Sequence, residues 1–272
     1  MPPVVMADEG GQGIESASAS PVFRWPGGRR AAISLAYDDA LDTQLDVAAP
    51  ALDRHGFKAS FYLTVANPAM RERLEEWRAL AVSGHELGNH SLFHACSGSG
   101  SGRGWVLAHR DLDRQPVARV QDEVRLANTV LMALDGRRDR TFTVPCGDRE
   151  AADGDYVEGL RGDFTAIKVM GGGVVADMAA LDLHAVPVAA PVGTSGEALI
   201  AIVEEAAARG TMANLTFHGI GGDHLAVSRE AHDALLAHLA AHPDIYWVET
   251  FIAIAGHVRA QREGVAATAP SP

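Results

Sequence analysis

The sequence predicts a single α/β domain built as a barrel of parallel strands, and three observations carry this prediction. Six or seven short apolar, β-leaning segments alternate with helical segments, which is typical of a parallel sheet. The length of 272 residues makes a closed or nearly closed barrel the economical arrangement of such units. Polar residues directly follow several of the strands, and in such barrels chemistry sits at the carboxyl ends of the strands.

The strand-like segments are short runs rich in apolar and β-branched residues, at 31–37, 58–64, 140–145, 164–169, 183–188, 211–218 and 245–249. Helical segments lie between them, at 41–56, 69–84, 117–136, 153–161, 195–209 and 228–241. Gly56, Gly84 and Gly136 end three of the helices, because glycine readily adopts the conformation that stops a helix. We expect His232, in the last helix, to be solvated.

Three Gly-, Ser- and Ala-rich stretches lack periodicity. They predict a flexible leader at 1–22, a loop at 96–105 and a flexible tail at 263–272, with the barrel domain at 23–262. The leader lacks the charged start and apolar core of an intact signal peptide, but its fragment VVMADE resembles the residues before a signal cleavage site. A processed exported protein and a protein with a disordered cytoplasmic leader therefore both stay open.

Charge and composition exclude several classes of partner. A formal net charge of −12 argues against nucleic acid, because binding to phosphates needs a basic surface, and also against anionic lipid. No run approaches the roughly eighteen apolar residues of a membrane span. The two cysteines, Cys96 and Cys146, are too few for a disulfide scaffold or a cysteine-based zinc site.

Residues that suit a metal site follow the predicted strands. Asp38 and Asp39 come directly after the first strand, and His218 ends the sixth. His90 and His94, in the segment after the second helix, are spaced so that both rings can bind one ion. Asp39 and the two histidines form a facial set with open positions. Such a set suits Zn²⁺ first, and also Co, Ni, Mn or Fe.

These residue types together predict a hydrolase. A bound divalent ion acidifies a water molecule and polarises a substrate carbonyl. Asp38 lies beside the candidate ligands and can act as the base, and His218 can protonate the leaving group. The expected reaction is hydrolysis of an amide or an ester.

Four motifs, in order, carry a family resemblance. SLAYDDA, NHSLFH, TVPCG and LTFH are similar to the successive motifs of the polysaccharide deacetylase (NodB homology) family, carbohydrate esterase family 4, over about residues 31–255. The resemblance implies a distorted (β/α) barrel, usually of seven strands, with one divalent metal ion. It also implies a carbohydrate oligomer or polymer as substrate. The family that it resembles removes acetyl groups, either the N-acetyl groups of chitin-like or peptidoglycan sugars or the O-acetyl groups of xylan.

The resemblance also implies a role for each matching residue. Asp38 corresponds to the catalytic base and His218 to the general acid, with metal-bound water attacking the acetyl carbonyl. The remaining positions are the metal ligands Asp39, His90 and His94, the bracing Ser91, and the third motif of Pro145, Cys146 and Gly147. In that motif the Cys146 backbone N–H helps to hold the oxyanion.

Departures from the motifs predict a variant branch of the family. Tyr37 and Ala40 replace a Phe and a Gly of the first motif. Thr143 occupies the position of the third-motif Arg, which pairs with the base in the family. We find no convincing counterpart of the Asp-x-x-Asp-Trp motif, for which Asp177 and Asp182 are candidates. The missing Arg motivates an alternative, a carbohydrate-binding protein that keeps the metal without turnover. A hydrolase of another small amide or ester is the second alternative.

Further residues border the expected site. Trp105 is a candidate for stacking on a sugar, and Asp223 with His224, in the stretch HGIGGDH, for part of the substrate cleft. Cys96 lies two residues past His94, and Cys146 lies within the third motif. Two interpretations of the cysteines stay open: a disulfide that clamps two loops in an exported protein, or two buried thiols.

Overall fold

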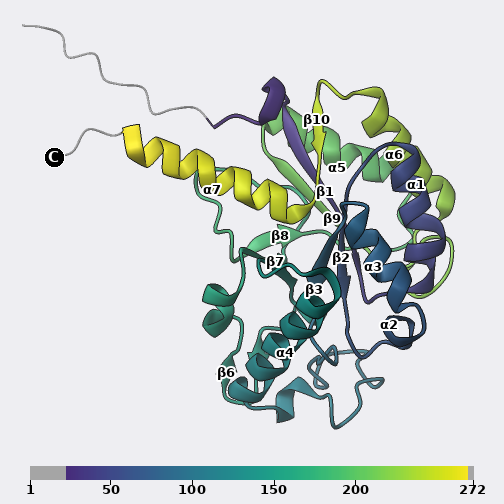
Figure 1. Ribbon diagram of the computed structural model, residues 1–272, viewed down its shortest axis with the longest axis vertical. Helices are drawn as coiled ribbons and strands as arrows, with labels where there is room; N and C mark the ends of the chain where they lie inside the picture. The colour runs from purple at the N-terminus through teal and green to yellow at the C-terminus, as the bar shows by residue number, and fades with distance from the viewer. Residues whose placement is uncertain (1–22, 269–272) are drawn as a thin grey trace, which may run out of the picture.

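The structure, a computed structural model, describes residues 23–268. Its centre is an eight-stranded parallel sheet, drawn in Figure 1. The strands are β1 (Ala31–Asp38), β2 (Ser60–Leu63), β3 (Glu86–Asn89), β4 (Thr141–Thr143), β7 (Ala166–Met170), β8 (Val186–Val188), β9 (Met212–Phe217) and β10 (Tyr246–Val248).

Seven of these strands form a nearly closed barrel in a single α/β domain, which confirms the predicted fold class. The neighbours run in the order β1, β2, β3, β4, β7 and β8, and β9 pairs with β1. A parallel bridge between Ala189 and Leu215 links the β8 side to β9. β10 pairs only with the first residues of β1, from Ala31 to Ile33, and extends the sheet beyond the barrel.

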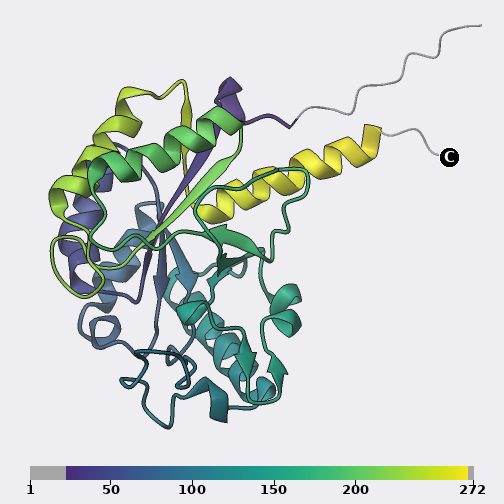
Figure 2. The ribbon, with the colours of Figure 1, turned by 180° about the vertical axis from the view of Figure 1, so that it is seen from behind.

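Helices surround the barrel on the outside, as Figures 1 and 2 show from opposite sides. The helices are α1 (Ala49–Arg54), α2 (Pro68–Glu72), α3 (Leu74–Val82), α4 (Val117–Asp135), α5 (Gly196–Arg209), α6 (Arg229–Ala241) and α7 (Phe251–Thr268). A π-helical turn, η2 (Gln44–Ala48), leads into α1. α5 and α6 pack against each other, whereas the far end of α7 extends away from the barrel.

The alternation of side chains along β1 separates two cores. Ile33 and Tyr37 belong to the core between the strands and the surrounding helices. Ala32 and Ala36 belong to a second core, inside the barrel. Because successive residues of a strand face opposite sides, Asp38 at the end of β1 faces the interior as well.

The amino ends of the strands are closed by the start of α7. The N–H groups of Phe251 and Ile252 donate to Ser60 Oγ at 2.8 Å and to Glu86 Oε2 at 3.0 Å. The partial positive charge of a helix N-terminus favours a carboxylate there, which helps to accommodate the buried Glu86. The open end of the barrel is therefore the carboxyl end of its strands.

One predicted element is wrong. The helix expected at 153–161 is absent, because Asp155 Oδ1 accepts the N–H of Val157 at 2.7 Å, a local bond that favours a turn. The chain forms instead two short antiparallel strands and a 3₁₀ turn, namely β5 (Glu150–Ala151), β6 (Gly154–Asp155) and η5 (Glu158–Asp163).

Two further elements, β3 and α7, have no counterpart in the prediction. α7 continues to Thr268 and so into the segment expected as a tail from residue 263. The expected leader at 1–22 and the last residues, 269–272, lie outside the described residues.

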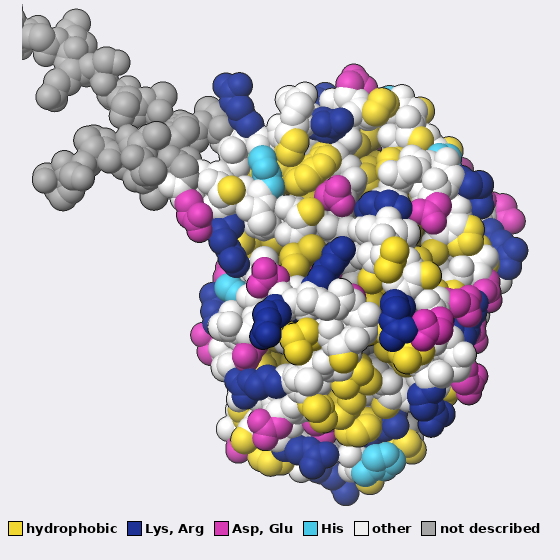
Figure 3. All heavy atoms as spheres, viewed as in Figure 1, with side chains coloured by type: hydrophobic (Ala, Val, Ile, Leu, Met, Phe, Trp, Pro, Cys, Tyr) yellow, Lys and Arg dark blue, Asp and Glu magenta, His cyan; other side chains and the backbone are white. Residues whose placement is uncertain are grey.

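The molecular surface carries mixed charge. Figure 3 shows basic and acidic side chains interspersed over one face of the molecule. None of the helices within residues 23–268 has both the length and the apolarity to cross a membrane.

Candidate active site

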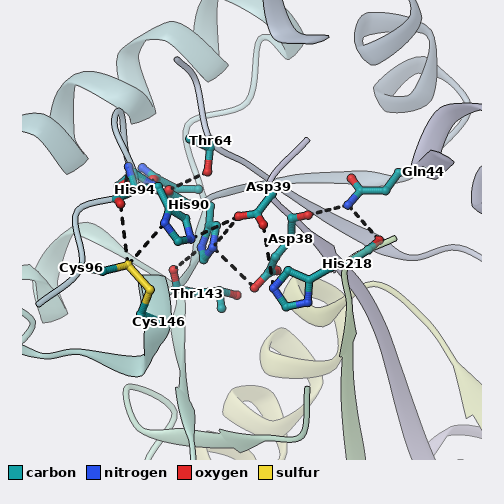
Figure 4. Close-up of polar contacts among 12 residues, drawn as sticks. Asp38, Asp39, Gln44, Thr64, His90, His94, Cys96, Thr143, Cys146 and His218 are labelled. Carbon is teal, nitrogen blue, oxygen red and sulfur yellow. Dashed lines mark hydrogen bonds and ion pairs between the residues drawn. A yellow bond between two sulfur atoms is a disulfide. The ribbon is translucent and has the colours of Figure 1, made fainter. Parts of the chain in front are cut away.

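The carboxyl ends of the strands surround a cavity of about 860 Å³. Figure 4 shows the side chains that converge at its floor. They come from the ends of β1, β4 and β9 and from the loop after β3, and the cavity lining includes Asp38, Asp39, His90, His94, Thr143, Cys146, Gly147 and His218. The structure therefore brings the main candidates of the sequence analysis into one place.

Asp39, His90 and His94 form a cluster suited to a metal ion. Asp39 Oδ1 lies 3.4 Å from His90 Nε2 and 3.2 Å from His94 Nε2, and the three candidate ligand atoms all lie within 4.8 Å of one another. Asp39 Oδ1 is buried without a hydrogen-bond partner. Three electron-pair donors thus lie close together, and the carboxylate oxygen among them has no hydrogen-bond partner. This arrangement fits a bound divalent cation.

The loop after β3 adopts a constrained backbone around these ligands. Ser91 and His94 have φ of 65° and 55°, and Asp39 across the site has φ of 84°. Residues other than glycine rarely take such values, and those that do often lie at functional sites. Ser91 Oγ accepts the N–H of His94 at 2.9 Å, and Asn89 Oδ1 accepts the N–H of Ser91 at 2.7 Å. Ser91 therefore braces the loop.

The other nitrogen of His90 is fixed from β4. His90 Nδ1 donates to the Thr143 carbonyl at 2.8 Å, since a carbonyl only accepts. In the neutral imidazole this bond keeps the proton on Nδ1 and leaves Nε2, which is directed at Asp39, available as a ligand atom, the arrangement common among metal-binding histidines.

Asp38 lies directly beside the cluster. Its Oδ2 is 3.7 Å from His90 Nε2, and its Oδ1 is buried with no hydrogen-bond partner. Burial raises the pKa of Asp38 well above that of an exposed carboxyl, and the charge of Asp39 acts in the same direction, while His90 and Lys168 oppose them. An unpartnered carboxylate with a raised pKa can accept a proton.

Lys168 is a buried cation inside the barrel that the sequence analysis missed. It lies on β7 in register with Thr143, the residue at the position of the third-motif Arg. Its Nζ donates to Ser34 Oγ at 3.0 Å and lies 4.5 Å from the ring centroid of Phe251 and 5.2 Å from that of Tyr62. A single lysine in the apolar run AIKV is the signal that could have found it.

Lys168 has an electrostatic link to the candidate base. Within residues 23–268 its ammonium group makes no ion pair with any carboxylate at 4.0 Å or less. Burial lowers the pKa of Lys168 to about 8, and the charges of Asp38 and Glu86 oppose that decrease. The interior therefore contains a positive charge near Asp38, supplied by β7 and not by the position of Thr143.

Two histidines approach Asp39 from the β9 side. His218 Nε2 lies 3.9 Å from Asp39 Oδ2, and burial lowers the pKa of His218 to about 4. His224 Nε2 makes a hydrogen bond of 2.7 Å to the same oxygen. Gln44 in the π-helical turn donates to the backbone carbonyls of Asp38 and His218, and so joins the ends of β1 and β9.

The third motif forms a tight turn at the cavity wall. Cys146 has φ of 57°, and Cys146 and Gly147 line the cavity, whereas Pro145 is buried outside the lining. Cys146 forms a disulfide with Cys96, with 5.9 Å between the Cα atoms. Of the two interpretations of the cysteines, the structure contains the clamp between the second- and third-motif loops.

The remaining candidates are distributed unevenly. Trp105 is 57% exposed and lines the cavity. Asp223 does not line it, because its Oδ2 accepts the N–H of Thr43 at 2.9 Å. Asp182 is paired with Arg161, and Asp177 also lies outside the cavity lining.

The expectation for His232 is wrong. His232 is fully buried, and its Nε2 lies 2.7 Å from the Tyr37 hydroxyl. The helical pattern did not reveal this contact because the partner lies on β1, far away in sequence.

A nearly closed parallel barrel with a carboxylate and two histidines at its strand ends defines a class, the α/β barrels with a candidate single-metal hydrolase centre. Comparison with known proteins identifies the family. The family model for polysaccharide deacetylase matches residues 26–158, which contain the first three motifs. The chain belongs to the polysaccharide deacetylase (NodB homology) family, as its motifs predict.

Solved structures share the fold at low sequence identity. A Mycobacterium smegmatis protein assigned to the polysaccharide deacetylases has a TM-score of 0.59 and 15% identity, covering 90% of this chain and 95% of that one. Peptidoglycan deacetylase PdaC from Bacillus subtilis has a TM-score of 0.55 and 15% identity, covering 87% and 95%. A mutant of BA3943, named a CE4 family pseudoenzyme, has a TM-score of 0.53 and 18% identity, covering 86% and 70%. The fold is therefore common to proteins named as enzymes and as pseudoenzymes.

A curated relative shares part of the sequence. Gellan lyase from Bacillus sp is 28% identical over 142 residues, which make up 52% of this chain and 5% of gellan lyase. The chain thus spans only a small fraction of the length of that relative.

Proposed function

We propose that this protein is a metal-dependent hydrolase that removes acetyl groups from N-acetylated or O-acetylated carbohydrate. The observation that carries the proposal is the cluster of Asp39, His90 and His94, whose donor atoms lie within 4.8 Å of one another at the floor of an open cavity. Two imidazoles and a carboxylate suit Zn²⁺ best among common ions. When bound, such an ion supplies acidification of a water molecule and polarisation of the acetyl carbonyl.

The protein's own side chains and backbone assist both the attack by water and the departure of the leaving group. Asp38, with its buried and unpartnered Oδ1, takes the proton of the attacking water. The backbone N–H of Cys146 at the cavity wall donates to the oxygen that becomes negative. His218 protonates the departing amine or alcohol.

Lys168 has a supporting role in this proposal. It balances the charge of Asp38 inside the barrel, a role that Thr143 cannot perform because its side chain is neutral. In this proposal Lys168 supplies the opposite charge for the base in a chain that lacks the third-motif Arg.

The test is acetate release from acetylated sugar oligomers by the metal-loaded protein. We expect release by the wild type and none above background by Asp38→Asn, with the variant still binding one divalent ion per chain. Ion binding with retained folding in the variant separates a lost base from a lost site.

The neutral Thr143 and the pseudoenzyme among the structural neighbours favour one alternative, a metal-retaining carbohydrate-binding protein without turnover. A metalloprotein that binds the oligomers but releases no acetate from any of them would support that alternative. Release from small esters or amides alone would support a hydrolase of another substrate on this scaffold.

A further inference from the structure

A small recess opens beside the main cavity, next to the candidate metal ligands. It has a volume of about 130 Å³ and is lined by Phe93, His94, Trp105, Val106, Leu107 and Arg110. His94, Trp105 and Arg110 also line the main cavity, so the two spaces share a wall. The recess therefore adjoins the space above the candidate metal ligands.

Arg110 in this recess lacks an anionic partner. Its side chain makes no hydrogen bond or ion pair with any residue from 23 to 268, and its Nε is buried and unpartnered. Its guanidinium carbon lies 5.6 Å from the centroid of the Phe93 ring, which holds the group by a cation–π contact. A partly buried guanidinium without an anion is unfavourable, so the recess favours a ligand that brings one.

The other arginine of the cavity lining, Arg103, shows the contrast. Arg103 Nη1 lies 2.5 Å from Asp148 Oδ2, and Nη2 lies 3.4 Å from Oδ1. Its charge is therefore already balanced. Asp111, next to Arg110 in the chain, does not balance Arg110, because its carboxylate accepts from Gly98 N–H at 2.9 Å and from Arg114 Nε at 3.1 Å.

The segment that carries Arg110 is held in place before any ligand arrives. The N–H of Leu112 donates to the Cys96 carbonyl at 2.9 Å, and Cys96 is tied to Cys146 by the disulfide. A recognition group that is already ordered loses less entropy on binding.

Trp105 adds an apolar platform to this cation. Its side chain is 57% exposed although it is a large aromatic residue, and it lines both the recess and the main cavity. An exposed indole offers an apolar face on which a sugar ring can pack, while the planar fork of a guanidinium matches the two oxygens of a carboxylate.

We propose that Trp105 and Arg110 form a subsite for an acidic sugar, so that the substrate is an acetylated carbohydrate carrying a carboxylate on a unit adjacent to the acetylated one. This inference rests on the proposed deacetylase function. The protein's net charge of −12 repels anions at long range, so the preference comes from the short-range fork of Arg110.

The experiment compares acetylated glucuronoxylan oligosaccharides with the same material after reduction of its carboxyl groups. The wild type is expected to have a kcat/KM for acetate release about tenfold higher on the acidic material, because a hydrogen bond to a charged group is stronger than one between neutral groups. Arg110→Gln should abolish this ratio mainly through KM, and Arg110→Lys should recover part of it. Arg119→Gln is the matched control, since Arg119 is exposed and paired with Glu123 on α4. It should keep the wild-type ratio.

A binding measurement separates this inference from the proposed function. Calorimetric titration of Asp38→Asn with deacetylated glucuronoxylan oligosaccharide, and with its carboxyl-reduced form, needs no turnover. We expect tighter binding of the acidic form, lost when Arg110→Gln is added. Equal binding of both forms, or a preference that survives Arg110→Gln, would overturn the subsite. A retained preference without acetate release by the wild type would support the subsite and overturn the proposed enzyme.

Discussion

Lys168 and Ser34 form a hydrogen bond of 3.0 Å inside the barrel, between Nζ on β7 and Oγ on β1. Ser34 lies four residues before Asp38 on the same strand, so both side chains face the interior. The contact holds the ammonium group against the strand that carries Asp38, and its charge opposes the rise in the Asp38 pKa.

Lys168→Met should lower kcat/KM for acetate release by about tenfold or more, because an ionised Asp38 then lacks its opposite charge; one pKa unit corresponds to about 1.4 kcal/mol. The free energy of unfolding should change by no more than about 2 kcal/mol, since the buried Asp38 can take up a proton and become neutral once its opposite charge is lost. Thr143→Arg in the Lys168→Met background should recover activity, because it returns a cation from β4. A loss that Thr143→Arg does not relieve would argue for a purely structural lysine.

His224→Ala should weaken metal binding by about tenfold, the usual range for a group that orients a ligand. His224 makes a 2.7 Å hydrogen bond to Asp39 Oδ2, and its loss leaves that carboxylate free to rotate. Competition with a chelator measures the affinity. His242→Ala, at the end of α6, is the control and should match the wild type. Equal metal affinities for His224→Ala and His242→Ala would show that His224 does not orient Asp39 for metal binding.

Replacing Cys96 and Cys146 with alanine should lower the free energy of unfolding by about 4 kcal/mol, the entropy expected for a cross-link across 50 residues. Denaturant unfolding measures this change. Mass spectrometry of the unreduced wild type should find no free thiol. Two free thiols, or a double variant as stable as the wild type, would exclude the clamp.

Stability should fall on mild acidification because of His232. Burial lowers its pKa to about 4, from the ordinary 6.5. Below pH 6.5 the unfolded chain therefore binds a proton that the folded protein does not, and the folded state loses up to about 3 kcal/mol by pH 4. His232→Gln should show a shallower dependence in unfolding experiments at pH 7, 6 and 5. Parallel curves for the two proteins would contradict the pKa shift.

The parts of the fold that the sequence predicts are those with strong local patterns. The apolar run of β1 and the periodicity of α4, α5 and α6 determine these elements regardless of their surroundings. β3 was missed because it contains polar residues whose hydrogen-bond partners lie far away in the sequence. Glu86 Oε2 accepts a hydrogen bond from the N–H of Ile252 in α7, and Asn89 Nδ2 donates one to the Val124 carbonyl in α4. Both partners are distant in sequence.

The same division holds for the site. Asp39, His90 and His94 were predictable because their spacing and order form recognisable motifs. Lys168 and Arg110 carry no motif. Their importance depends on burial and on missing partners, which only the folded chain defines. Asp223 lies in a glycine-rich loop that was expected to form part of the substrate cleft, but its carboxylate accepts the N–H of Thr43 instead.

The central claim is that one ion held by Asp39, His90 and His94 is required for acetate release. The direct measurement is a Zn²⁺ titration of the metal-stripped protein, with bound metal and acetate release from an acetylated oligosaccharide followed together. The account predicts that activity rises with occupancy to a plateau at about one ion per chain, as expected for a single catalytic ion, and that His90→Ala shows neither binding nor release. Full activity in the stripped protein, or unchanged binding in His90→Ala, would contradict it.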